Sequence, residues 1–272
     1  MNEDYLYEDF EYKDELTGRR EMIRGSRKRK KRRKKHLFLN ILILIALLTG
    51  VYFLATSNFF EIRTFEVENA AAEPGHYMKE KIVEMSGIQK GTNIFETSMR
   101  SAEIALEKDP YIIKASVNRR LPHTVVLTVI ERQENFVIAH GNTYAVMDYE
   151  GMVLRLTDAP GSLTVVDNLT VIRAEPGTAL EVDETALLSQ TIAFLKKVEE
   201  NDLFFKRITA SDISVKAYVY DNLICRGSLK NIGDNINSLK GVLLDLRQKE
   251  VVRGTVFVGG SGTCTFSPEE DT

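Results

Sequence analysis

Histidine, cysteine and carboxylate side chains are all present in this chain, but their spacing forms no known catalytic or metal-binding pattern. The four histidines are scattered and none lies in an H-E-x-x-H arrangement: His36, His76, His123 and His140. No G-x-S-x-G, S-x-x-K or phosphate-binding loop motif occurs, and no pair of acidic residues is set apart for acid–base catalysis. We therefore predict no catalytic, cofactor-binding or metal site, and we expect a function that depends on binding.

The two cysteines, Cys225 and Cys264, could form a disulfide if the segment that carries them lies in an oxidising compartment. Both fall in predicted strands, where a cysteine often serves as a small buried apolar side chain. The sequence leaves both states open, and we expect free thiols.

A strongly basic run stands directly before an uncharged apolar segment. Residues 37–55 contain no charged side chain, and 19 residues of helix at about 1.5 Å each can span the roughly 30 Å core of a bilayer. Cations beside such a helix keep that end in the cytoplasm, so we predict a single-pass protein with an extracytoplasmic C-terminal part. The predicted topology determinants are Arg27, Lys28, Arg29, Lys30, Lys31, Arg32, Arg33, Lys34 and Lys35.

Two other interpretations of this junction are open. A cleaved signal peptide has a short basic start and an apolar run of about 7–15 residues, whereas 26 residues precede the basic run here. A nucleic-acid-binding run would normally alternate with aromatic residues for base stacking, and this one contains none. We expect a retained membrane anchor.

The net charge of −3 conceals two parts of opposite sign. Residues 1–36 carry 13 Lys/Arg against 8 Asp/Glu, whereas the remainder carries 23 against 31. The first 26 residues lack core-forming periodicity and are predicted to be disordered. We divide the chain into a cytoplasmic tail (1–36), a transmembrane helix (37–55), two extracytoplasmic domains (60–133 and 134–267) and a polar C-terminal tail (268–272).

The first extracytoplasmic segment begins with a strand and continues with two helices. Phe65 and Val67 alternate with glutamates, as in a half-buried strand. Apolar residues then recur at helical spacing, and Gly87 is expected to end the first helix. The second helix is predicted at residues 98–108, before an Asp-Pro pair that cannot continue it.

Two strands rich in β-branched residues follow these helices. In the first, Ile113, Ala115 and Val117 are predicted to share one side, and Val117 and Val129 are both predicted to face the helices. The order strand, helix, helix, strand, strand favours a three-stranded sheet with both helices on one face.

This segment resembles the POTRA (polypeptide-transport-associated) domain of the FtsQ/DivIB family of bacterial cell-division proteins. Within "DPYIIKASVNRRLPHTVVLTVIER", the positions that match the family pattern are Pro110, Val117, Arg120, Leu121, Pro122, Thr124, Glu131 and Arg132. Pro122 restricts Leu121 to extended geometry, which suits a hairpin corner. The resemblance implies an α+β fold: a single transmembrane helix, a POTRA domain of order β-α-α-β-β, and a mostly antiparallel β domain with two helices.

The second domain is expected to consist mainly of short strands. Its "YAVMDYEGMVL" stretch is similar to the family's strand, Asp-x-x-Gly, strand segment. Helices are predicted at residues 181–200 and around Ile236 to Leu246, with a hairpin turning at Asp221 and Asn222 between them. Two short strands around residues 259–262 close the chain.

The resemblance implies a non-enzymatic scaffold at the division septum. Its implied partners are FtsL-type and DivIC/FtsB-type bitopic proteins, through which it is linked to septal peptidoglycan synthesis. The family's partner-binding strand maps onto Thr263, Cys264, Thr265 and Phe266. A strand near the chain end, followed by Pro268, suits an exposed sheet edge that accepts a partner strand, and we expect Phe266 to anchor it.

Two alternatives belong to other functional classes. A membrane-anchored cell-wall enzyme requires a catalytic constellation that the sequence does not show. A secretion-type POTRA module normally repeats the domain or leads into a long β-barrel. Only one copy is visible, and the remaining residues are too few for such a barrel.

Overall fold

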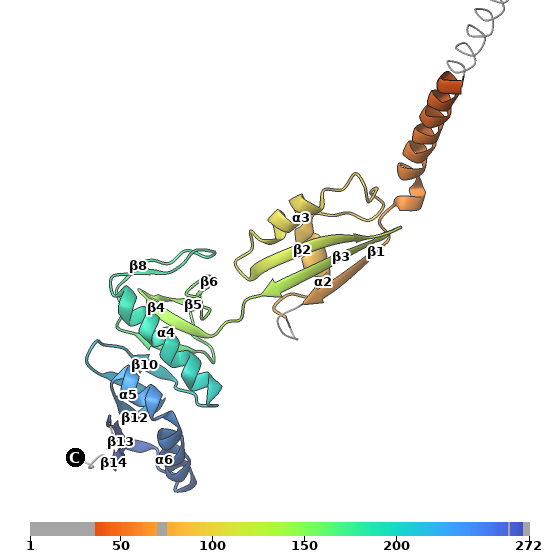
Figure 1. The fold of residues 1–272 in the computed structure, drawn as a ribbon. Coiled ribbons are helices and arrows are strands. Elements are labelled where there is room, and N and C mark those ends of the chain that lie inside the picture. The colour runs from red at the N-terminus through yellow and green to blue at the C-terminus, as the bar shows by residue number, and fades with distance from the viewer. Residues whose placement is uncertain (1–35, 70–74, 261, 269–272) are drawn as a thin grey trace, which may run out of the picture. The chain divides into compact units, whose positions relative to one another are not determined.

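The computed structural model describes residues 36–69, 75–260 and 262–268. The chain forms two compact units, each described here by itself. The first contains Met1–Arg63, Lys90–Thr97 and Leu121–His123, and the second contains the remaining residues (Figure 1). The basic run 27–35, the predicted disordered tail before it and residues 269–272 lie outside the described residues.

The first unit is dominated by one long helix, His36–Ala55, which is apolar enough to cross a membrane. Its side chains are exposed along nearly the whole length, as expected for a helix whose surroundings are lipid. A short 3₁₀ helix, η1 (Asn58–Phe60), follows. The chain therefore carries one candidate membrane span within its described part, as the sequence predicts.

A three-stranded sheet and two helices form the POTRA-like part of the second unit. The strands occur in the order β1-β3-β2, with β1 parallel to β3 and β2 antiparallel to it. The elements are β1 (Thr64–Asn69), α2 (Lys79–Ser86), α3 (Met99–Leu106), β2 (Ile112–Arg120) and β3 (Thr124–Glu131). This is the predicted order, and the α+β fold class is confirmed.

Local capping explains where the two helices begin and end. Gly87 ends α2, as predicted. Its φ is +70°, a left-handed conformation that glycine adopts readily. The Ser98 side chain accepts a hydrogen bond from the Ser101 N–H and so caps α3. The second helix ends at Leu106, two residues earlier than predicted.

One sequence-based assignment on β2 is wrong. Val117 and Val129 are buried as predicted, and Ala115 faces the core with them. Ile113, however, is 42% exposed, whereas Ile112 is buried. The pairing with β3 shifts between Ile112 and Lys114, and this irregularity reverses the alternation of the residues before it.

The rest of the second unit is built on one nine-stranded sheet of order β14-β13-β12-β11-β10-β7-β4-β5-β6. Most neighbours are antiparallel, and the pairs β4–β7, β7–β10 and β12–β13 are parallel. The strands are β4 (Phe136–His140), β5 (Thr143–Met147), β6 (Val153–Thr157), β7 (Thr164–Asp167), β10 (Arg207–Thr209), β11 (Val215–Tyr220), β12 (Asn222–Gly227), β13 (Arg253–Val258) and β14 (Cys264–Ser267). A separate pair consists of β8 (Val171–Arg173) and β9 (Glu181–Val182).

Helices α4 (Thr185–Glu200), α5 (Leu229–Asp234) and α6 (Ile236–Gln248) contribute to one apolar core with this sheet. The first begins four residues later than predicted, because Glu181 and Val182 pair with β8 instead. Glu184 fixes the start by accepting hydrogen bonds from the Thr170 N–H and hydroxyl. The short α5, capped by Ser228, is an addition to the two predicted helices.

Candidate partner-binding surface

The predicted partner strand lies at an open edge of the nine-stranded sheet. Among the residues that the structure describes, β14 is the last strand in the order and pairs on one side only, with β13. Cys264, Thr265 and Phe266 belong to this strand, and Thr263 lies in the turn before it. The backbone at this edge can therefore accept a further strand.

The hydrogen-bond alternation of the hairpin shows which edge groups point outward. The Gly259 N–H donates to the Thr263 carbonyl oxygen at 3.0 Å. Because hydrogen-bonded and non-bonded pairs alternate in antiparallel strands, the pair Phe257–Thr265 is bonded and the pair Val256–Phe266 is not. Phe266 and Cys264 therefore direct their N–H and C=O groups to the open side, while those of Thr265 bind β13.

Phe266 has a packing role within its own domain. It lies opposite Val256, is half-buried, and packs against the core beneath the sheet. A Cβ atom on Gly254, whose φ is +127°, would come within 2.5 Å of the Phe266 ring. The glycine thus gives the ring room to cover the strand, and the predicted contact of Phe266 with a partner stays a prediction.

An exposed aromatic side chain stands on the other face of the same edge. Phe257, on β13, is 44% exposed. The strand registers place it in one row with Arg226 on one side and Thr265 on the other, and Arg226 in turn pairs with Lys216. This row, here called the outer row (Lys216, Arg226, Phe257 and Thr265), combines an apolar anchor with two cations.

Phe257 is a candidate contact residue that was not predicted from the sequence. Its signal is the alternation in β13, where Val256 and Val258 are buried and Phe257 occupies the opposite phase. A large apolar residue in the phase that faces water is a candidate contact residue here because it lies beside the edge strand β14.

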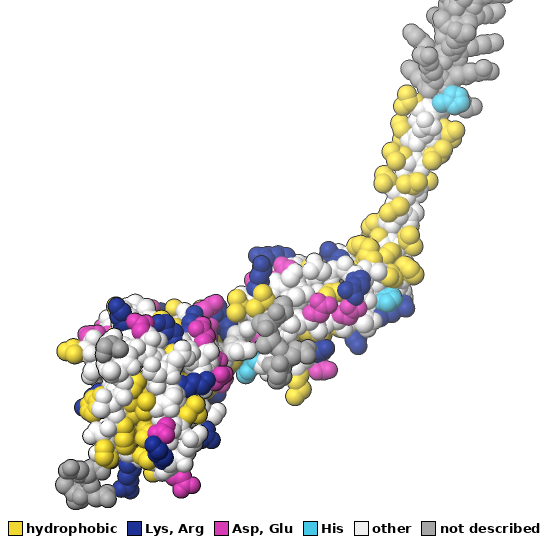
Figure 2. Space-filling view, turned by 60° about the horizontal axis from the view of Figure 1, so that its bottom comes forward, with side chains coloured by type: hydrophobic (Ala, Val, Ile, Leu, Met, Phe, Trp, Pro, Cys, Tyr) yellow, Lys and Arg dark blue, Asp and Glu magenta, His cyan; other side chains and the backbone are white. Residues whose placement is uncertain are grey.

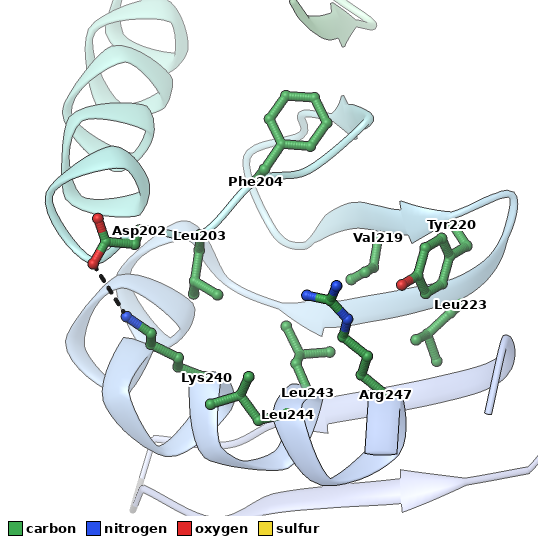
Figure 3. A pocket seen from close by; sticks show the side chains of 10 residues that line it. All are labelled: Asp202, Leu203, Phe204, Val219, Tyr220, Leu223, Lys240, Leu243, Leu244 and Arg247. Atoms are coloured by element: carbon green, nitrogen blue, oxygen red, sulfur yellow. Dashed lines mark hydrogen bonds and ion pairs between the residues drawn. The ribbon is translucent and has the colours of Figure 1, made fainter. Parts of the chain in front are cut away.

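A hollow of about 350 Å³ lies on the helix side of the same sheet region. Figure 3 shows Leu243 and Leu244 of α6 pointing into it opposite Val219 and Leu223, with Phe204 and Tyr220 farther along the wall. The Lys240 ammonium is held by the Asn201 carbonyl at 2.6 Å and by Asp202 at 3.4 Å. Phe204 is 57% exposed, so the hollow is an accessible apolar surface.

Both thiols are free, as expected. Cys225 lies on β12 and Cys264 on β14, with β13 between them. Two strand spacings separate their backbones by about 9–10 Å, more than the ~7 Å that a disulfide can bridge. Burial raises the pKa of the Cys225 thiol to about 12, so it acts as a small apolar core residue.

The two sequence stretches that resemble the FtsQ/DivIB family meet at a buried ion pair. The Arg132 guanidinium binds the Asp148 carboxylate, and their side chains are only 12% and 6% exposed. The other Asp148 oxygen accepts hydrogen bonds from the Glu150 N–H at 2.9 Å and the Met152 N–H at 2.8 Å. Gly151, at φ +84°, completes this turn. The Asp-x-x-Gly segment is thus a turn motif whose aspartate also holds Arg132.

Across residues 36–69, 75–260 and 262–268, no three His, Cys, Asp or Glu side chains are grouped so that they could hold a metal ion. His76 stacks on Tyr111 at 3.7 Å between ring centroids. His36 begins the apolar helix and His140 ends β4, so the histidines occupy separate elements. The groups that this surface offers are backbone edge groups, one aromatic ring and cations.

Comparison with known proteins shows that the sequence is similar to cell-division proteins. Residues 60–132 match the model of the POTRA domain, FtsQ-type. The cell division protein DivIB of Clostridium acetobutylicum is 26% identical over 194 residues, which cover 70% of this chain and 78% of the relative. DivIB of Clostridium botulinum (strain Hall) is 25% identical over 89% of this chain and 94% of the relative.

This chain is a relative of the cell-division proteins DivIB and FtsQ. The resemblance noted in the sequence is thereby confirmed. The cell division protein FtsQ of Syntrophotalea carbinolica is 26% identical over 55% of the chain and 53% of its own length. The names of the DivIB and FtsQ relatives support a role in cell division, and the apolar helix fits a single-pass membrane protein.

Proposed function

We propose that this protein is a non-enzymatic, single-pass scaffold of the bacterial division machinery. In this proposal its N-terminus is cytoplasmic, its C-terminal part is extracytoplasmic at the septum, and it binds FtsL-type and DivIC/FtsB-type bitopic proteins. Through them it is linked to septal peptidoglycan synthesis. The single observation that supports partner binding best is the open edge of β14 beside the exposed Phe257.

The proposed mode of recognition is strand addition. A partner strand would pair with the outward N–H and C=O groups of Cys264 and Phe266, which main-chain hydrogen bonds can satisfy without a particular side chain. Specificity would come from the outer row. An apolar partner residue would cover Phe257, and an acidic one would face Arg226 and Lys216. The expected partner segment is therefore extended, apolar on one side and acidic.

The test is the affinity of the full-length protein for each bitopic partner, measured beside its thermal stability. Phe257→Ser should weaken binding by about 1–3 kcal/mol, because an aromatic anchor at an interface loses its buried area. Its effect on stability should be small, since the ring is already 44% exposed. Phe204→Ser, at a ring 57% exposed that lines the hollow and lies outside the outer row, is the control and should leave affinity unchanged.

Two further substitutions separate binding from folding. Phe266→Ala should lower the melting temperature, because the ring packs over Gly254. Thr265→Pro removes an N–H that binds β13, so it too should act on stability first. If Phe257→Ser and Phe204→Ser leave the affinity equally unaffected, the outer row is not the binding surface.

A further inference from the structure

A group of aromatic side chains lies at the C-terminal end of the apolar helix. Tyr52 and Phe53 occupy its last turn and are 65% and 69% exposed. Just beyond it, Phe59 is 58% exposed and Phe95, from a distant loop, is 46% exposed. Phe60 stands between the last two, with ring centroids 5.0 Å from Phe59 and 4.9 Å from Phe95. We call Phe59, Phe60 and Phe95 the helix-end cluster.

Backbone hydrogen bonds fix this cluster. The Ile94 N–H donates to the Phe60 carbonyl at 2.9 Å, and the Ile62 N–H donates to the Thr92 carbonyl at 2.9 Å. Glu61 and Asn93 form an isolated bridge between the same two segments. Phe95 is therefore held beside the chain that leaves the helix, although 35 positions separate it from Phe60.

A side-chain hydrogen bond ties the same loop to the helix itself. The Asn93 amide donates to the Ala55 carbonyl oxygen at 2.7 Å. This carbonyl belongs to the last helical residue and has no partner in a further helical turn. The helix and the helix-end cluster belong to one compact unit, so the cluster has a defined distance from the apolar span.

That distance corresponds to the headgroup region of a bilayer. The described part of the helix has 20 residues, about 30 Å, which matches the hydrocarbon core. A bilayer with its interfaces is about 40–45 Å thick, so each interface extends roughly 5–7 Å beyond the core. Phe59 follows Ala55 by four residues, and the Ser57 N–H still bonds back to the Leu54 carbonyl in a tight turn. Its ring therefore lies within that layer, where aromatic side chains are enriched.

The space-filling view agrees with this placement. Figure 2 shows hydrophobic side chains continuing along the helix to its C-terminal end. The charged residues of this unit that flank the cluster balance one another: Glu61 and Glu96 against Arg63 and Lys90. The cluster therefore has no excess of positive charge that would attract an acidic peptide or an anionic lipid. The surface is apolar at its centre and mixed at its rim.

We propose that the helix-end cluster is a lipid-binding surface, with Phe59 and Phe95 inserted among the headgroups of the leaflet at the C-terminal end of the helix. The loop that carries Phe95 would then lie at the membrane surface beside the end of the helix. This inference rests on the membrane anchoring included in the proposed function. The inference goes beyond the proposed function because it assigns a second membrane contact to the protein.

The chain contains no tryptophan, so a single introduced tryptophan is a unique fluorescent reporter. Full-length Phe95→Trp is reconstituted at low density into neutral phosphatidylcholine vesicles, with and without lipids brominated near the headgroup. We expect blue-shifted emission, quenching by the brominated lipid and protection from aqueous acrylamide. Phe204→Trp, at an exposed ring of the second unit, should show none of the three.

A third reporter distinguishes failure of this inference from failure of the anchor. Leu48→Trp, within the apolar helix, should be quenched by lipids brominated deep in the acyl chain. If Leu48→Trp is quenched but Phe95→Trp behaves like Phe204→Trp, the helix spans the membrane but the helix-end cluster does not bind lipid. If Leu48→Trp is not quenched, both the membrane anchor and the lipid contact are wrong. Protection of Phe95→Trp from acrylamide without bromolipid quenching means that protein, such as a second copy, covers the cluster, and this also overturns the proposal.

The loop contact provides an independent check. Asn93→Ala in the Phe95→Trp background removes both the hydrogen bond to the Ala55 carbonyl and the one that the Asn93 side chain accepts from the N–H of residue 95, and should reduce the bromolipid quenching. A matched change on the same loop, Glu96→Gln, removes one exposed charge and should leave the quenching unchanged. Equal quenching in both variants would show that Asn93 does not position the ring, and would contradict a fixed position of the loop at the membrane.

Discussion

Arg132 and Asp148 show how single residues of a sequence motif acquire their role. Each can be picked out from the sequence, since Arg132 ends the POTRA-like string and Asp148 begins the Asp-x-x-Gly segment. Their ion pair could not be predicted, because it depends on how the chain folds back between them. In the structure Asp148 satisfies two backbone N–H groups with one oxygen and Arg132 with the other. Replacing either Arg132 or Asp148 should therefore destabilise the fold.

A double-mutant cycle tests this pair. Arg132→Met should cost about 3–5 kcal/mol of unfolding free energy, because it leaves the buried Asp148 charge without compensation. Asp148→Asn should cost less, since the amide oxygen can still accept both backbone hydrogen bonds. The double variant should be more stable than the sum of the two losses indicates. Simple additivity in denaturant titrations would show that the two side chains are not energetically coupled.

Phe257 and Phe266 mark the limit of residue-scale prediction at the candidate site. The sequence analysis selected Phe266 because it lies near the chain end in a β-prone segment. The structure half-buries Phe266 and leaves Phe257 more exposed, since the two occupy opposite phases of paired strands. Assigning a phase requires the register between strands, and the sequence alone does not specify it.

At the scale of the elements, long periodic segments were predicted well and local irregularities were not. The β-α-α-β-β order follows from apolar spacing, from Gly87 and from the Asp-Pro pair that ends the second helix. The register shift at Ile113 could not be predicted, because a bulge is a property of two strands and the alternating pattern describes only one. The pairing of Glu181 and Val182 with β8 is likewise non-local.

The register shift at Ile113 allows a comparison of two matched substitutions on β2. Val117→Asp places a charge at a position 4% exposed, with no cation opposite it, and should cost several kcal/mol and unfold the POTRA domain. Ile113→Asp introduces the same group four residues earlier, where the side chain is 42% exposed, and should cost less than about 1 kcal/mol. Thermal unfolding of the full-length protein measures both. If Ile113→Asp is the more damaging change, the register of β2 is wrong by one residue.

For the whole molecule, the length of the apolar segment and the charges beside it predict the membrane anchor and its orientation. The anchor follows from an uncharged span of bilayer length, and the structure describes one such helix, His36–Ala55. The proposed orientation depends on the cations at residues 27–35, which lie outside the described residues. It therefore rests on the preference of Lys and Arg for the cytoplasmic side.

Protease accessibility tests that orientation. Protease added to intact protoplasts should remove the second unit and spare the tail, because the second unit is expected to be extracytoplasmic. Replacing most of the cations at residues 27–35 with Gln should reduce the uniformity of insertion, since the charge bias that sets direction is lost. A C-terminal part that stays protected in the unaltered protein would reverse the proposed topology.

We propose that the β14 edge, with Phe257 beside it, binds a division partner. The most direct measurement is site-specific photocrosslinking in dividing cells, with a photoreactive phenylalanine at Thr265 and, as control, at Leu156. Leu156 is 43% exposed on β6, the opposite edge of the same sheet. We predict that position 265 crosslinks to a single-span division protein, identified by mass spectrometry, and that position 156 does not. Crosslinks to that partner from position 156 and none from position 265 would contradict the account.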